Sequence, residues 1–60
     1  MTLKDFCFDV LGDFVSMDSV IIQNNRVIVL RHGSIPADVI RDEWDRKSKG
    51  TEFENISLFI

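Results

Sequence analysis

The sequence predicts a single α+β domain in which an N-terminal helix packs on a three- to four-stranded antiparallel sheet, together with a short second helix. Three observations favour this fold class. Apolar residues recur at helical spacing at the start of the 60-residue chain, two β-branched runs follow with a turn between them, and apolar residues alternate near the end. No linker, repeat or low-complexity tract divides the chain, so residues 1–60 are expected to form one domain.

The first expected element is a helix over residues 3–14. Thr2 is well placed as its N-cap, and Asp5, three positions later, completes a variant of the capping box. The apolar residues of this segment are spaced so that they share one buried helix face: Leu3, Phe6, Cys7, Val10, Leu11 and Phe14.

A β-hairpin is expected next, with strands over residues 19–23 and 26–31. Asn24 and Asn25 lie between the strands, and asparagine tolerates the positive φ that a two-residue type I′ turn requires. This turn predicts a register in which Ile22 faces Val27, and it brings Asp18 opposite Arg31 as an ion pair.

Alternation along the hairpin predicts that both of its faces are apolar and need covering. One face carries Val20, Ile22, Val27 and Val29, and the other carries Ile21, Ile28 and Leu30.

Gly33 ends the hairpin, and Pro36 is expected in the first turn of a second helix, where its missing N–H costs nothing. Val39, Ile40 and Trp44 then share one helix face. A competing interpretation ends this helix near residue 42 and makes residues 43–49 a strand; the helix is slightly favoured.

The last segment alternates between apolar residues and their neighbours, which predicts a strand. Ile56, Leu58 and Ile60 alternate with Asn55, Ser57 and Phe59.

Composition excludes several classes of protein. The net charge is −3, with seven Lys and Arg against ten Asp and Glu, which argues against direct nucleic-acid binding. The longest apolar runs, 20–22 and 27–30, are far shorter than the ~20 residues of a membrane span. Nothing resembles a signal peptide, and the lone Cys7 suggests a reducing cytoplasm.

Enzymatic chemistry finds little support, and neither a cofactor nor a metal is expected. Residues 27–33 end in Arg31-His32-Gly33 and resemble the signature of the histidine phosphatase superfamily, but that family uses a second histidine and His32 is the only one here. Cys7 falls in the middle of the apolar helix face, where a thiol behaves as a buried hydrophobe with a raised pKa. The sequence therefore predicts a protein that is not an enzyme.

An acidic stripe on the first helix is the first candidate binding feature. Asp5, Asp9 and Asp13 recur every four residues, about 6 Å apart along the helix axis. Two interpretations stay open. The stripe docks on a basic partner, such as the nucleic-acid-binding groove of another protein, or it is a solvated face that keeps a small protein soluble; the second is favoured.

Three apolar residues are further candidates for a partner contact. Phe8 and Val15 are seven residues apart, so in a helix they lie on one side, flanking the buried stripe. Alternatively Phe8 folds over the edge of the core. Trp44 is a core anchor or, alternatively, a binding hot spot. Together with the two apolar hairpin faces, these residues predict self-association as a homodimer.

The order of segments also carries a resemblance. Thr-Leu-Lys-Asp-Phe opens a helix, a short Val/Ile hairpin follows, and Gly33, Ile35, Pro36 and Asp42 introduce an acidic helix before a last strand. This order resembles small proteins encoded by phages and prophages of Gram-positive bacteria. The resemblance implies an accessory protein that works by binding in the cytoplasm of a bacterial host cell. In that setting inhibitors of host defence, including anti-CRISPR proteins, are small and often acidic.

Overall fold

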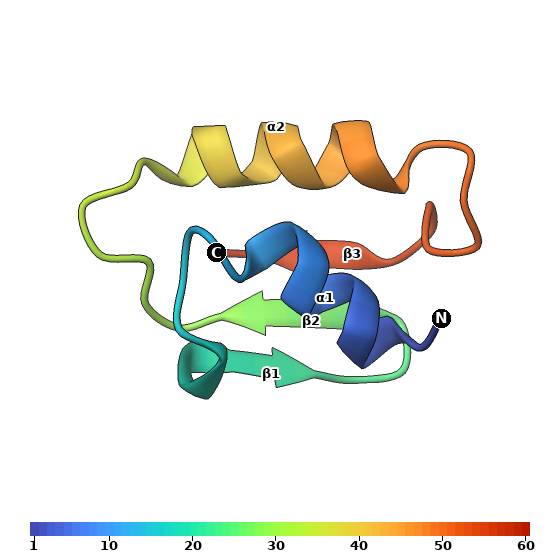
Figure 1. Cartoon of the computed structure of the whole chain (residues 1–60), viewed down its shortest axis with the longest axis horizontal. Helices are drawn as coiled ribbons and strands as arrows, with labels where there is room; N and C mark the ends of the chain where they lie inside the picture. Colours follow the sequence, from blue (N-terminus) through green and yellow to red (C-terminus); the bar gives the residue numbers. More distant parts are fainter.

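The computed structural model describes residues 1–60 and confirms the α+β class. Two helices and a three-stranded sheet form the fold, with α1 lying across one face of the sheet and α2 running beside β3 (Figure 1). The elements in chain order are α1 (Leu3–Leu11), the 3₁₀ turn η1 (Met17–Ser19), β1 (Val20–Ile22), β2 (Arg26–Val29), α2 (Ala37–Ser48) and β3 (Ser57–Phe59).

The sheet is mixed, so the expectation of an antiparallel sheet is wrong for its last strand. β1 pairs antiparallel with β2 in the predicted register, with Ile22 opposite Val27. β3 instead runs parallel to β2, with Leu58 beside Val27. Parallel neighbours need a crossover of about a dozen residues or more, and residues 30–56, which contain α2, supply it.

The hairpin turn closes where expected but in another conformation. The Gln23 N–H donates to the Arg26 carbonyl at 2.8 Å, so Asn24 and Asn25 form the loop. Neither asparagine has a positive φ, and the type I′ assignment is therefore wrong. The Asn25 carbonyl accepts the Ser57 N–H at 3.0 Å, which ties Asn25 to the incoming β3 strand.

The expected ion pair between Asp18 and Arg31 does not form. Asp18 lies in η1, a turn that precedes β1, and β2 ends at Val29. The hairpin is therefore shorter than predicted, and neither side chain is held opposite the other by strand pairing.

α1 begins as predicted and ends earlier. The Thr2 hydroxyl accepts the Asp5 N–H at 3.2 Å while the Asp5 carboxylate accepts the Thr2 N–H, which is a complete capping box. The helix ends at Leu11, whose carbonyl accepts the N–H groups of both Phe14 and Val15. A turn follows, and Phe14 lies half-buried against the core.

α2 is a continuous helix, so the alternative strand over residues 43–49 is wrong. Pro36 is its N-cap rather than a residue of its first turn. Ile40, Trp44 and Ser48, spaced four residues apart, are buried. Val39 was expected on the same face, but it is 47% exposed because it lies about 100° around the helix from Ile40.

Aromatic rings join the two helices to the segment before β3. The Phe6 ring meets Trp44 edge-on, with centroids 5.1 Å apart, and stacks on Phe53 at 4.5 Å. On the sheet side, Arg41 Nη1 donates to the Leu58 carbonyl at 3.0 Å and links α2 to β3. The core therefore lies between the helices and one face of the sheet. Neither helix has the length and apolar character needed to cross a membrane.

Candidate binding surfaces

The outer face of α1 carries an exposed aromatic ring between carboxylates. Helix α1 buries Phe6 and its apolar partners against the core and leaves the opposite side in solvent. Phe8 is on that side and is 66% exposed, with the exposed Asp5 one turn before it and Asp9 directly after it. One turn after Phe8 stands Gly12, which has no side chain to cover the ring. We call Asp5, Phe8 and Asp9 the α1 outer face.

The acidic stripe is only partly helical. Asp5 and Asp9 lie on α1, whereas Asp13 lies in the turn after it, and all three are exposed. Asp5 also caps the helix through the Thr2 N–H. The Asp9 and Asp13 carboxylates accept no hydrogen bond and form no ion pair within the protein, so they are free to meet a partner.

Val15 and Trp44 do not belong to an exposed contact patch. Val15 is 8% exposed, because α1 ends at Leu11 and the chain then turns Val15 inward instead of continuing the side that carries Phe8. Trp44 is 1% exposed and packs against Phe6, so it is a core anchor. The structure brings Phe8 together with Asp5 and Asp9, and it separates Val15 and Trp44 from them.

The second candidate surface is the sheet face turned away from α1, which we call the open sheet face. Ile21 is 42% exposed, Leu30 is 59% exposed and Phe59 is 47% exposed, while Ile28 between them is half-buried. The Arg26 guanidinium lies over the Phe59 ring, 5.4 Å from its centroid. As predicted, both hairpin faces are apolar, and the helices cover only one of them.

Phe59 is a functional candidate that the sequence reasoning missed. Its pairing opposite Ile28 places it on the open sheet face, next to the apolar residues of the hairpin. The alternation of Leu58 with Phe59 already indicated that the two side chains point to opposite faces. Only the parallel pairing of β3 with β2 shows which hairpin residues Phe59 joins.

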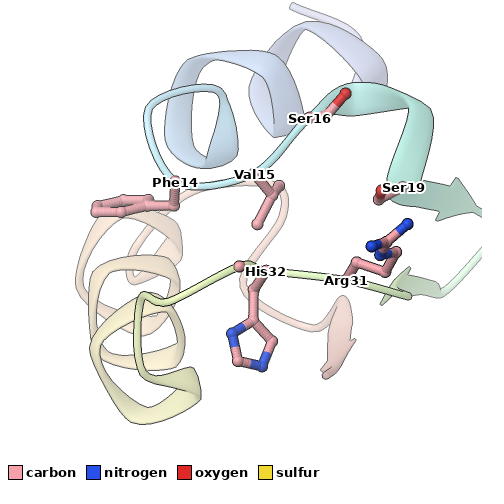
Figure 2. Close-up of a pocket in the computed structure, with 7 residues that line it drawn as sticks. Phe14, Val15, Ser16, Ser19, Arg31 and His32 are labelled. Carbon is pink, nitrogen blue, oxygen red and sulfur yellow. The ribbon is translucent and has the colours of Figure 1, made fainter.

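The Arg31-His32-Gly33 segment borders a pocket of about 440 Å³. The Arg31 side chain turns toward Ser19, whereas the His32 ring points the other way (Figure 2). His32 Nδ1 lies 2.6 Å from the Ile35 carbonyl, and since a carbonyl can only accept, Nδ1 carries the proton. Arg31 and His32 therefore do not face a common centre. The pocket is lined by Phe14, Val15, Ser16, Ser19, Arg31, His32 and Gly33.

A second hollow of about 460 Å³ lies beside the α1 outer face. Asp9 and Lys47 both line it, and they form no ion pair with each other. The Phe6 and Phe53 rings contribute its apolar wall.

Cys7 is fully buried, as predicted. Burial removes water from the thiol and raises its pKa from 9.0 to about 11. At neutral pH the thiol is protonated and unreactive, so Cys7 acts as a small apolar residue of the core. No group of three or more His, Cys, Asp and Glu side chains is placed to hold a metal ion.

No protein-family model, curated protein or solved structure matches this chain. The chain is therefore classified by its own fold and surfaces. It is a small α+β domain with two helices, an acidic helix face and an uncovered sheet face.

Proposed function

We propose that this chain is a non-enzymatic protein-binding module that docks through the α1 outer face on a basic surface of a partner protein. The observation that carries the proposal is the exposure of Phe8 between Asp5 and Asp9. Aromatic residues are frequent hot spots of protein interfaces, and complementary charges around them speed association and select the partner.

The chemistry of this face defines the partner. Free carboxylates at Asp9 and Asp13 favour a partner surface rich in Lys or Arg, and the Phe8 ring favours an apolar depression within it. A groove that binds nucleic acid combines these properties, because it collects basic side chains that pair with phosphates. The resemblance to small phage-encoded proteins supports an inhibitor that blocks such a groove in a host defence protein.

Charge reversal tests the proposal. Proteins from a bacterial host lysate would be retained on the immobilised chain and on a double variant, Asp9→Lys with Asp13→Lys, which leaves the Asp5 cap intact. We expect a retained basic protein that duplex DNA displaces and that the variant loses. The matched control, Asp42→Lys with Asp45→Lys, makes the same charge change on exposed positions of α2 and should keep the protein.

Phe8→Ala gives the second arm of this experiment. The ring is exposed, so its removal should leave the fold intact and weaken partner binding by about 2 kcal/mol, or roughly 30-fold. Equal retention of the partner by wild type, the Asp9/Asp13 variant and Phe8→Ala would contradict docking through this face.

An assembly protein whose oligomer is the product is the second candidate function. Phe8 is on the outer side of α1, and α1 lies across the sheet face opposite the open sheet face (Figure 1). Contact of one copy's Phe8 with the next copy's open sheet face would therefore build an open chain of copies. Growth of the scattering mass with concentration beyond that of a dimer would favour this function.

A further inference from the structure

We infer that a second copy of this chain covers the open sheet face, giving a two-fold symmetric dimer whose two α1 outer faces point away from each other. The dimer is inferred independently of the proposed docking function. Its consequence for partner binding rests on that function.

The distribution of charge selects a second copy as the occupant. No strand residue of this sheet is Asp or Glu, and the open sheet face presents Ile21, Ile28, Leu30 and Phe59. A basic partner would find no carboxylate on these strands, and Arg26 is the one cation that they carry. An identical apolar face is complementary to this one, and it leaves the carboxylates of both net-negative copies in solvent.

Arg26 also indicates how the two copies are oriented. It lies at the first residue of β2, at one end of the open sheet face, and its guanidinium already contacts Phe59 of the same chain. When two copies pack with their β2 strands antiparallel, the two Arg26 residues lie at opposite ends of the interface. This orientation avoids placing like charges together in a region that loses its water.

The interface would extend beyond the strands themselves. Stable complexes bury about 800 Å² on each partner, which is about a fifth of the 4170 Å² surface of this chain. Because β1, β2 and β3 are only three to four residues long, the loops that flank the sheet would contribute part of this area. The molecule measures 29 × 20 × 16 Å, and the sheet lies along its broad side, as Figure 1 shows. Packing through this side would bury three exposed hydrophobic residues at once: Ile21, Leu30 and Phe59.

The dimer would make the proposed binding module bivalent. α1 packs on the sheet face opposite the open one, so two copies joined through their open faces carry Phe8 on opposite outer surfaces. One dimer would then bind two partner molecules, one on each side. A complex of two chains with two partners is expected, and a monomeric variant should form a one-to-one complex.

Light scattering and sedimentation of the purified chain, from about 10 to 500 μM, test the dimer. We expect the mass to approach 13.8 kDa, twice the 6.9 kDa of one chain. Leu30→Lys and Phe59→Lys should hold it near 6.9 kDa, because each places a cation in the apolar interface. Val39→Lys on α2 replaces a hydrophobic residue of comparable exposure outside the open sheet face, and it should dimerise as wild type does.

Several outcomes would overturn the dimer. The wild-type chain could stay monomeric throughout this range, or the Leu30→Lys variant could still dimerise. The measured mass could also keep growing beyond that of two chains. If Phe59→Lys unfolds through loss of the Arg26 contact, Leu30→Lys decides, because Leu30 lies outside the strands. Loss of the dimer in Phe8→Ala would also contradict the interface, whereas loss of partner binding alone in that variant would not.

Discussion

The two faces of the sheet are built from similar residues and meet opposite environments. On the face toward α1, Val27, Val29 and Leu58 are buried. On the other face, Ile21 and Phe59 keep more than two fifths of their surface in solvent. Because neighbouring residues of a strand point to opposite faces, a strand rich in Val and Ile supplies both faces with apolar side chains. The difference teaches that the helices, and not the strands, decide which face becomes the core.

The strongest test of this comparison removes Trp44, the largest fully buried side chain of the core. Trp44→Ala should lower the free energy of unfolding by about 3–5 kcal/mol, because it leaves a cavity beside Phe6. In a 60-residue domain this is most of the stability, so circular dichroism should show a largely unfolded chain. Val39→Ala on the exposed side of the same helix is the control and should change stability by less than about 1 kcal/mol. Equal losses in both variants would contradict the assignment of these two helix faces.

Adjacent residues of β3 compare the two sheet faces directly. Leu58→Ala should cost about 3 kcal/mol in urea unfolding, because Leu58 is buried. Phe59→Ala should cost less than about 1 kcal/mol when measured at low protein concentration, where self-association contributes least. Similar losses in the two variants would mean that the open sheet face is covered within one chain.

The pKa of Cys7 tests whether water is excluded from the core beneath α1. Its pKa is raised to about 11 in the folded chain, so between pH 9 and 11 the unfolded chain loses the thiol proton while the folded chain keeps it. Stability therefore falls as pH rises through this window, by about 2–3 kcal/mol at pH 11. The Cys7→Ala variant should lose this part of the pH dependence, and parallel stability curves for the two proteins would contradict it.

The same residue gives a kinetic contrast between the two sides. In a Leu30→Cys variant at low protein concentration, where the chain is monomeric, a chromogenic thiol reagent should label the cysteine at position 30 at once and Cys7 only as fast as the chain unfolds. Wild type serves as the control and should show the slow phase alone. Fast labelling of Cys7 in the folded wild-type chain would show that water reaches this part of the core.

The smallest expected effect concerns the contact between α2 and β3. Arg41→Met keeps the aliphatic part of the side chain and removes the donor to the Leu58 carbonyl, which should cost about 1 kcal/mol in urea unfolding. Arg46→Met is the matched control on the same helix, because its partner is the nearby Glu43 and an exposed pair of this kind contributes little. An Arg41 variant as stable as the Arg46 variant would mean that the hydrogen bond does not stabilise the attachment of β3.

Most local features could be predicted from the sequence. The Thr2–Asp5 capping box, the register of Ile22 with Val27 and the burial of Cys7 depend on residues close in the chain or on a single periodic pattern, and the structure confirms them. The direction of β3 could not be predicted, because an alternating strand fits a parallel and an antiparallel neighbour equally well. The hydrogen bond between the Asn25 carbonyl and the Ser57 N–H could not be predicted either, because it joins residues more than 30 positions apart in the chain.

The residues of the candidate surfaces also differ in whether local sequence patterns could place them. Asp5, Phe8 and Asp9 could be placed together from helical spacing alone. Val15 was misplaced because the same spacing was extended beyond Leu11, where the helix ends. Phe59 was missed because its neighbours are set by the pairing of β3 with β2, which no local pattern encodes.

The sequence by itself determined the elements of this protein: where α1 begins, where the hairpin turns, and that both faces of the hairpin are apolar. These features follow from side-chain periodicity and from backbone preferences that act over a few residues. Only the tertiary structure decided that both helices lie on the same side of the sheet and that β3 pairs parallel with β2. It also decided that Ile21, Leu30 and Phe59 stay exposed on one face. The physical reason is that the two sheet faces are similarly apolar, so local patterns do not distinguish them. Contacts between segments distant in the sequence decide which face the helices cover.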